Sequence, residues 1–318
     1  MDTSENGPCP NALTVDVEDY FHVSAFRRLV PYAEWDHMES RVERNTHKVL
    51  ELLEEFHLHG TFFIMGWVAE RYPSLVRAIQ AAGHELGCHS YAHRLVYELT
   101  PDEFRADTRR ALCAIEDVAG LPVRAYRAPS FSITAHSLWA LEILLELGFT
   151  ADSSIFPARN WLYGISNAPR QPFRIRANGS DLLEFPPATL RIVGCNIPAT
   201  GGAYLRLLPY RFQAFALARM ADRGEPIVLY FHPWELDPAQ RRLAARLGPK
   251  FYHYMGLNRT EERLRRLFTK FPFGKLSEYG GARATVYEVR LSEHRKTNLL
   301  SSRCCAHDED NSGIVRLG

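Results

Sequence analysis

The sequence predicts an α/β fold in which parallel strands close into a (β/α) barrel. Short apolar segments typical of buried strands alternate with amphipathic helical segments from residue 12 to residue 231. Polar residues follow several of these strands at their C-terminal ends, which is where (β/α) barrels build their active sites. The chain contains neither of the two common glycine-rich phosphate-binding motifs, which disfavours an open nucleotide-binding sheet.

Each strand is expected where β-branched and aromatic residues form a short apolar run. These runs cover residues 12–19, 60–66, 85–87, 123–129, 150–154 and 226–231, with shorter candidates at 173–175 and 182–185. The helices are expected where apolar residues recur with helical spacing, at residues 41–56, 68–82, 100–119, 137–147, 211–223 and 260–270. The helix after residue 100 opens with Thr100, Pro101 and two acidic residues, a pattern typical of a capped N-terminus.

These elements predict one folded domain with flanking segments. Residues 1–11 form a flexible leader, residues 12–290 a single barrel domain and residues 291–318 a disordered tail. Within the domain, residues 156–209 are expected to form an irregular insertion and residues 237–290 a C-terminal extension. Residues 201–206 at the end of the insertion are compatible with a substrate-binding loop or with a simple turn before a helix.

The composition is that of an ordinary globular protein, with 318 residues, 46% hydrophobic residues and a formal net charge of +1. This balance predicts no electrostatic attraction to nucleic acid or to an anionic membrane. No apolar run approaches the roughly 20 residues of a membrane span, so stable membrane insertion is not expected. The N-terminus has no secretion signal, and the six cysteines form no CxxC pair, which favours reduced thiols and a cytoplasmic protein.

Two histidines, His89 and His93, follow the strand expected at residues 85–87. One helical turn would place residues four apart on the same side, so both imidazoles could bind one metal ion. A catalytic metal needs one further protein ligand and an open position for water. The alternative is a pair of polar residues on a solvated loop.

Five segments in this order resemble the five motifs of the polysaccharide deacetylase family, the NodB-homology domain of carbohydrate esterases. They are residues 14–19 (TVDVED), 89–93 (HSYAH), 127–129 (RAP), 152–154 (DSS) and 230–232 (YFH). The resemblance covers roughly residues 12–236, and the form of residues 16–21 is similar to the branch found in bacterial exopolysaccharide gene clusters. It implies a distorted (β/α)7 barrel and metal-dependent removal of N-acetyl groups from a glycan.

The resemblance also implies a role for each residue that matches a motif. Asp16 corresponds to the catalytic base and Arg127 to the residue that holds this base by an ion pair. His232 corresponds to the general acid and Asp152 to its carboxylate partner.

His89 and His93 correspond to the two histidine ligands of the metal, whereas the third ligand is left open. The family has two adjacent aspartates in its first motif, but Val17 separates the acids here, so the third ligand is Glu18 or Asp19. Strand alternation places Glu18 on the same face as Asp16, which slightly favours Glu18. Such a site suits Zn, which we expect here, and also Co or Ni.

Two further departures from the family concern the walls of the acetyl pocket. The aromatic residue that follows the aspartate of the fourth motif is missing, and Tyr230 stands where the family has leucine.

The expected activity is N-deacetylation of a glycan that contains N-acetylhexosamine, such as an exopolysaccharide or its precursor. The alternatives are hydrolysis of a small amide or imide and a catalytically silent glycan-binding module. The oligomeric state is left open.

Overall fold

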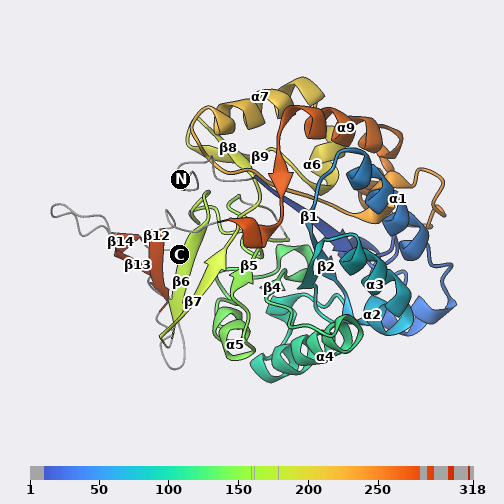
Figure 1. Ribbon diagram of the computed structural model, residues 1–318, viewed down its shortest axis with the longest axis horizontal. Coiled ribbons are helices and arrows are strands. Elements are labelled where there is room, and N and C mark those ends of the chain that lie inside the picture. Colours follow the sequence, from blue (N-terminus) through green and yellow to red (C-terminus); the bar gives the residue numbers. More distant parts are fainter. Residues whose placement is uncertain are drawn as a thin grey trace, which may run out of the picture.

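A computed structural model describes residues 11–158, 160, 162–177, 179–279, 285–289, 300–303 and 314–315. Its core is a curled sheet with helices packed around the outside (Figure 1). Seven strands of this sheet pair in parallel, in the spatial order β10-β1-β2-β3-β4-β5-β7. They are β1 (Asn11–Val17), β2 (Thr61–Ile64), β3 (Glu85–Cys88), β4 (Ala125–Tyr126), β5 (Ala151–Asp152), β7 (Ser180–Glu184) and β10 (Val228–Phe231).

The seven strands do not form a complete ring of strand pairs, because no pairing joins β7 to β10 among the described residues. The chain that follows β7 bridges this gap instead. The backbone N–H of Ala188 donates to the carbonyl of Val228 at 3.1 Å, and the hydroxyl of Thr200 donates to the same oxygen at 3.1 Å. The predicted barrel is therefore present in a distorted form, in which irregular chain closes one side.

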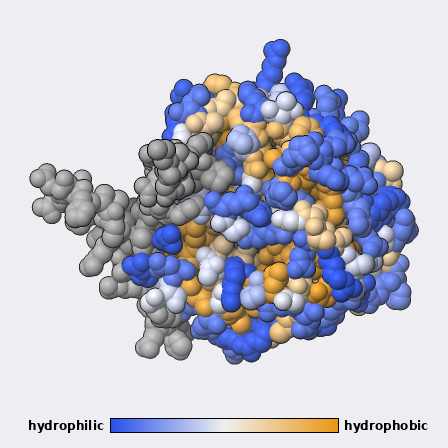
Figure 2. Space-filling model, in the orientation of Figure 1, coloured by the Kyte–Doolittle hydropathy of each residue, from blue (hydrophilic) through white to orange (hydrophobic). Residues whose placement is uncertain are grey.

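Nine helices of the described chain surround the sheet. They are α1 (Val42–Glu55), α2 (Gly66–Arg71), α3 (Pro73–Ala81), α4 (Pro101–Ala119), α5 (Ala140–Glu146), α6 (Gly202–Leu207), α7 (Tyr210–Ala221), α8 (Leu247–Tyr254) and α9 (Thr260–Lys270). The outer surface in the view of Figure 1 is mostly hydrophilic along its rim (Figure 2).

The predicted start of α4 is confirmed. The Thr100 hydroxyl accepts from the backbone N–H of Glu103 at 3.2 Å, and the Glu103 carboxylate accepts from the Thr100 N–H at 2.9 Å. These contacts satisfy helix donors that have no partner within the helix. Gly120 ends the helix in the left-handed conformation, with φ of 67°.

The single helix predicted over residues 68–82 is wrong, because the chain forms two helices, α2 and α3. Pro73 has no backbone N–H and disfavours helical geometry in the residue before it. Tyr72 accordingly adopts φ of −126° and ψ of 59° and separates the two helices. The apolar spacing continues across the break, which is why the pattern alone suggests one helix.

The segment expected to be irregular, residues 156–209, contains more regular structure than the sequence predicts. The strand candidates near residues 173 and 182 are confirmed as β6 (Phe173–Ala177) and β7, which form an antiparallel hairpin. A second hairpin, β8 (Thr189–Ile192) with β9 (Cys195–Pro198), was not expected. Its two-residue turn needs positive φ at Val193 (46°) and Gly194 (81°). Glycine is usual in such a turn, but valine rarely adopts this conformation, so the sequence signal for a hairpin is weak.

Residues 201–206 do not form an open loop, because helix α6 begins at Gly202. Gly201 is required at its position: it has φ of 84°, and a Cβ atom there would lie 1.9 Å from the ring of Tyr230.

The C-terminal part carries β11 (Phe273–Gly274), which pairs with β1, and β12 (Thr285–Val289), which pairs with β6. Two short strands, β13 (Leu300–Arg303) and β14 (Ile314–Val315), extend this edge where the sequence suggests a disordered tail. Cross-strand pairing, which local composition does not reveal, accounts for this difference. The other tail residues and residues 1–10 of the leader lie outside the described residues, and the predicted domain division stays a prediction.

Candidate active site

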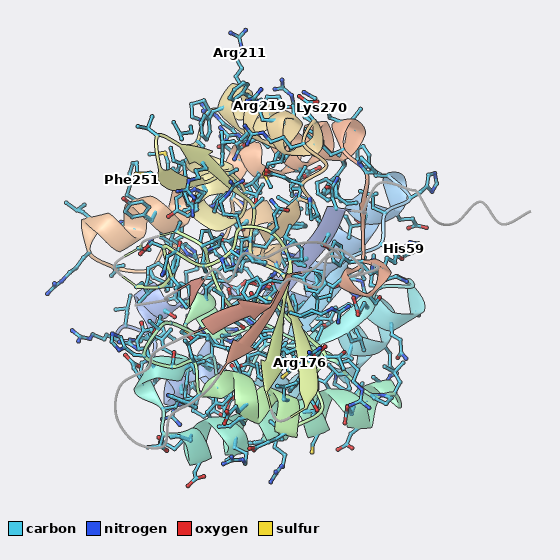
Figure 3. The ribbon with its side chains drawn as sticks, turned by 90° about the vertical axis from the view of Figure 1, so that its left-hand side faces the viewer. His59, Arg176, Arg211, Arg219, Phe251 and Lys270 are labelled. Atoms are coloured by element: carbon cyan, nitrogen blue, oxygen red, sulfur yellow. The ribbon has the colours of Figure 1, made fainter. Side chains whose placement is uncertain are left out.

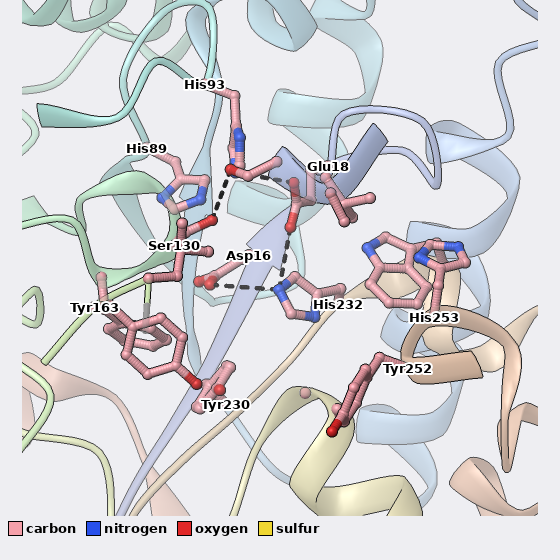
Figure 4. Close-up of a pocket in the computed structure, with 18 of the residues that line it drawn as sticks. Asp16, Glu18, His89, His93, Ser130, Tyr163, Tyr230, His232, Tyr252 and His253 are labelled. Carbon is pink, nitrogen blue, oxygen red and sulfur yellow. Dashed lines mark hydrogen bonds and ion pairs between the residues drawn. The ribbon is translucent and has the colours of Figure 1, made fainter. Parts of the chain in front are cut away.

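The C-terminal ends of the parallel strands surround one pocket (Figure 4). Its lining combines motif residues with residues from the irregular segment and the C-terminal extension. It includes Asp16, Glu18, His89, His93, Ser130, Phe131, Tyr163, Arg206, Tyr230, His232, Trp234, Tyr252 and His253.

Asp16 and Arg127 form a buried ion pair at the base of this pocket. The Nη1 atom of Arg127 lies 2.7 Å from Oδ1 of Asp16 and 2.8 Å from the hydroxyl of Thr14. The remaining guanidinium donors reach the carbonyl and hydroxyl of Ser153 at 3.1 and 2.7 Å. The guanidinium of Arg127 is fully buried and is held in place by these hydrogen bonds. Arg127 therefore fixes the orientation of the Asp16 carboxylate.

Glu18, His89 and His93 come together as a group that could hold a metal ion. One ligand atom from each lies within 4.8 Å of the others, and all three side chains are buried. His93 Nε2 is 3.1 Å from Oε2 of Glu18. His89 uses Nδ1 to donate to the Arg127 carbonyl at 2.8 Å, which leaves its Nε2 lone pair for a ligand.

The chemistry of this group fits a divalent metal. Burial lowers the pKa of His89 and lowers that of His93 to about 4, so both imidazoles are neutral, which is the form that binds metals. Nδ1 of His93 is buried and has no hydrogen-bond partner among the described residues, and Oε2 of Glu18 has none besides its 3.1 Å contact with His93 Nε2. Two neutral imidazoles and one carboxylate form a donor set used by catalytic zinc sites.

The two histidines do not meet across a helical turn, as their spacing suggested. Residues 89–95 form a loop, in which Ser90 and His93 have positive φ values of 60° and 51°. The Ser90 hydroxyl accepts from the N–H of His93 at 3.1 Å, and Asp107 accepts from the N–H of Tyr91 at 2.8 Å. Local side-chain contacts therefore set the loop that brings both imidazoles to the pocket.

Asp19, the other candidate for the third ligand, lies away from this group. One of its oxygens accepts from the N–H of Tyr20, and the other accepts from the Ser40 hydroxyl and the N–H groups of Arg41 and Val42. These donors belong to the chain that enters α1, so Asp19 holds the start of this helix. Burial raises the pKa of Asp19 to about 6.

His232 follows β10 and points at Asp16 of β1 and at Glu18, the residue after β1 (Figure 4). Its Nε2 atom is 3.1 Å from Oε1 of Glu18 and 3.8 Å from Oδ2 of Asp16. Burial lowers the pKa of His232, but the charge of Glu18 and hydrogen bonds to Glu18 and Glu235 outweigh burial and raise this pKa to about 10.

The structure does not bring Asp152 to His232, although the resemblance implied this partnership. Asp152 Oδ1 instead accepts from the Ser154 hydroxyl at 2.5 Å, and Asp152 pairs in register with Glu184 of β7. Both carboxyl groups are completely buried. Burial raises the pKa of Asp152 to about 6 and raises that of Glu184 well above its usual value, so this pair favours sharing a proton.

Glu235 occupies the position next to His232 that was expected for Asp152. Its Oε2 atom is 2.9 Å from Nδ1 of His232 and also accepts from the His232 N–H at 3.0 Å. Its other oxygen accepts from Nε of Arg206 at 2.6 Å. Burial raises the pKa of Glu235, but the charge of Arg206 and the hydrogen bond to His232 outweigh burial and lower it to about 2.

Sequence reasoning missed the roles of Glu235 and Arg206, although one local pattern pointed to Glu235. His232 is followed by proline and, three residues later, by an acidic residue, which is the spacing of a helix capping box. The corresponding contact bends Glu235 back onto His232. Arg206 lies 29 residues earlier on α6, so no local pattern could link it to the acid.

Comparisons with known proteins identify two families in this chain. Residues 31–151 match the family described as Polysaccharide deacetylase, and residues 153–280 match the family described as Domain of unknown function (DUF3473). Residues 31–151 thus form a domain of the polysaccharide deacetylase family. Within the described residues, no helix combines the length and hydropathy needed to cross a lipid bilayer.

Two relatives and one solved structure illustrate the likeness. A peptidoglycan-N-acetylglucosamine deacetylase of Bacillus cereus is 32% identical over 98 residues, which are 30% of this chain and 36% of that protein. A chitooligosaccharide deacetylase of Azorhizobium caulinodans is 31% identical over 117 residues, 36% of this chain and 54% of that protein. The matches thus span about a third and about half of these relatives.

The crystal structure of a Mycobacterium smegmatis protein assigned to the polysaccharide deacetylases has a TM-score of 0.61 at 22% identity. The match covers 93% of this chain and 97% of that one. At this identity the likeness concerns the fold, and it confirms the distorted (β/α)7 barrel predicted from the family resemblance.

The pocket wall is rich in aromatic side chains. Phe131, Phe156 and Tyr230 form a buried cluster against which Tyr163 and Tyr204 pack. The ring centroids of Phe131 and Tyr230 are 4.9 Å apart. Tyr230, one of the departures from the family pattern, therefore forms part of the pocket wall as expected.

Proposed function

We propose that this protein is a metal-dependent hydrolase that removes N-acetyl groups from a polysaccharide containing N-acetylhexosamine, or from its precursor. The observation that carries the proposal is the convergence of three groups on one pocket. They are the candidate metal ligands Glu18, His89 and His93, the Asp16–Arg127 ion pair, and His232.

Glu18, His89 and His93 would hold the metal, for which Zn is the first choice and Co or Ni are alternatives. When bound, such an ion supplies a Lewis acid for the acetyl carbonyl and increases the acidity of water. Asp19 remains a weaker candidate for the third ligand, because its oxygens already accept four hydrogen bonds.

The protein's own groups then supply the proton transfers. Asp16, oriented by its ion pair with Arg127, accepts a proton from the attacking water as a new carbon–oxygen bond forms. His232 donates a proton to the sugar nitrogen as the carbon–nitrogen bond breaks, because an amide nitrogen leaves poorly without a proton. The products are acetate and a free amine. Glu235 holds Nδ1 of His232 and stabilises its protonated form, a role assigned to Asp152 by family resemblance.

We further propose that the glycan is an exopolysaccharide or its precursor and that the protein acts in the cytoplasm. The form of residues 16–21 supports the first point. The second is supported by free thiols at Cys88, Cys113 and Cys195, three described cysteines that form no disulfide.

Acetate release from N-acetylglucosamine oligomers tests the proposal. The purified protein is assayed with and without chelator, with Zn or Co added back, and as His89→Ala and Asp16→Asn. His47→Ala, a change at an exposed histidine of α1, is the matched control. We expect activity that the metal restores, that both site variants lack and that the control keeps.

Two results would contradict the proposal. Tight metal binding without acetate release from any oligomer would favour a small amide or imide as the substrate. Neither metal binding nor hydrolysis, with glycan binding retained, would favour a silent glycan-binding module.

A further inference from the structure

The segment between Asp237 and Glu261 has an unusual charge distribution. It contains five cations and no acidic residue, so residues 238–260 carry a charge of +5. The whole chain carries a net charge of +1, so the residues outside this segment together carry −4. The near-neutral total, which suggested no attraction to an anionic membrane, therefore conceals a strongly basic region.

The same segment exposes large apolar side chains. Of the ten large hydrophobic residues exposed among the described residues, four fall within residues 247–255. They are Leu247 (86% exposed), Phe251 (51%), Tyr252 (61%) and Met255 (46%). Figure 3 shows Phe251 of α8 at the outer surface of the protein. We define the α8 face as Arg246, Leu247, Lys250, Phe251, Tyr252 and Met255.

The cations of this face are exposed and form no ion pair within the described chain. Arg246 and Lys250 are both exposed, and neither takes part in any ion pair found among the described residues. The guanidinium of neighbouring Arg242 stacks on Tyr254, 4.3 Å from the ring centre.

Buried contacts hold α8 in a fixed position. His253 and Tyr254 are buried, and the ring of His253 stacks on that of Trp234 with centroids 4.2 Å apart. Arg206 donates to the carbonyls of Tyr252, His253 and Met255 at 2.7 to 2.9 Å. The C-terminal end of α8 is thus tied to the body of the protein, and its exposed side chains form a stable surface.

We propose that the α8 face docks on an anionic membrane surface. Arg246 and Lys250 would contact acidic lipid headgroups, while Leu247 and Phe251 enter the boundary between headgroups and acyl chains. An acidic polysaccharide could also attract the cations, but it would leave the aliphatic Leu247 and Met255 exposed to water. The combination of cations with aliphatic and aromatic side chains therefore favours lipid.

The position of this face relative to the pocket adds to the argument. Tyr252 belongs to the α8 face and also lines the pocket (Figure 4). Docking through α8 would hold the pocket opening close to the membrane surface. The proposal does not depend on which reaction the pocket performs, because membrane binding is measured without substrate.

Co-sedimentation of the full chain with lipid vesicles tests the proposal. Vesicles of phosphatidylcholine are compared with vesicles that also contain phosphatidylglycerol, at low and high salt. One variant, Leu247→Ser with Phe251→Ser, removes apolar contacts, and a second, Arg246→Gln with Lys250→Gln, removes charge. The matched controls lie on α7: Phe215→Ser (56% exposed) and Arg211→Gln with Arg219→Gln. Figure 3 shows Arg211 and Arg219 on another part of the surface than Phe251.

We expect binding to phosphatidylglycerol vesicles that weakens with salt and is absent with phosphatidylcholine alone. Since each basic residue near an anionic surface contributes about fivefold to partitioning, the charge variant should bind about 25-fold more weakly. The apolar variant should also lose binding, and both α7 controls should keep it. Thermal unfolding of each variant verifies that the fold is intact.

Three outcomes would overturn the proposal. The first is no binding of the full chain to anionic vesicles, and the second is equal binding by all variants. The third is retention on an acidic polysaccharide resin without vesicle binding, which would assign the face to a glycan. Acetate release is measured on the same samples, so a failure of docking can be told apart from a failure of the proposed reaction.

Discussion

The contact between Glu235 and His232 allows a direct test of how the proposed general acid is held. Replacing Glu235 by Gln keeps the size of the side chain and removes its charge. Three contacts of the carboxylate are affected: the 2.9 Å contact to Nδ1 of His232, the 3.0 Å contact from the His232 N–H and the 2.6 Å contact from Arg206. The carbonyls of Tyr252, His253 and Met255 still accept from Arg206. The fold around Arg206 should therefore persist.

The expected loss follows from the strength of the contact to His232. A buried hydrogen bond to a charged group contributes about 1.5 to 3 kcal/mol, and each 1.4 kcal/mol is a factor of ten in rate. If this contribution is made in the transition state, where His232 donates its proton, kcat should fall roughly 10- to 150-fold. KM should change little, because Glu235 is fully buried and holds His232 rather than substrate.

The assay is steady-state acetate release, with thermal unfolding as a check on the fold. Asp152→Asn is measured alongside, because the family resemblance assigned the partnership to that residue. We expect Asp152→Asn to reduce kcat much less than Glu235→Gln, since Asp152 contacts Ser154 and Glu184 and not His232. Full activity of Glu235→Gln together with a large loss in Asp152→Asn would refute the reasoning.

Three further predictions concern metal binding, stability and the pocket wall. Glu18→Gln should abolish stoichiometric Zn binding in a calorimetric titration. Asp19→Ala should keep Zn binding but lower the free energy of unfolding by about 2 kcal/mol, since it removes the hydrogen-bond acceptor at the start of α1. Loss of Zn binding in Asp19→Ala, with Zn binding kept in Glu18→Gln, would contradict this prediction. Burial lowers the pKa of His253 to about 3, so the unfolded chain binds the extra proton first as pH falls below 6.5. The free energy of unfolding should therefore decrease by about 2 kcal/mol between pH 6.5 and pH 5 because of this histidine. Urea unfolding of His253→Gln should depend less on pH than that of the unchanged protein, and an equal pH dependence of the two proteins would contradict this prediction. Gly201→Ala should destabilise the fold and alter KM, because the new Cβ meets the ring of Tyr230; unchanged unfolding and kinetics would show that the wall tolerates it.

The sequence predicts the barrel strands well because each is a short apolar run with a polar end. It predicts α4 in detail because Thr100 and Glu103 are close in the chain and act through a local contact. The break at Tyr72 could have been predicted from Pro73, but the apolar spacing continues across it.

The parts of the site that could not be predicted depend on contacts between distant segments. The pairing of Glu235 with Arg206, and the packing of Asp152 against Glu184, are set by how the strands lie side by side. Family resemblance assigned the partner of His232 by position in a motif, whereas the structure fills the same place from another element. The choice between Glu18 and Asp19 likewise depended on where the chain turns after β1, and Asp19 turns towards α1.

The place of β1 in the sheet has a consequence for how the protein is made. This first strand pairs with β2 on one side and with β10 on the other, and the Thr14 hydroxyl bonds to the carbonyl of Leu229, 215 residues later. During synthesis, the edge of β1 that pairs with β10 therefore stays unpaired until most of the chain has left the ribosome. The pairing of β1 with β10 also joins Asp16 and Glu18 to His232, so a chain truncated before β10 would lack both its last parallel strand and its candidate acid. Such pairing between distant segments predicts slow folding.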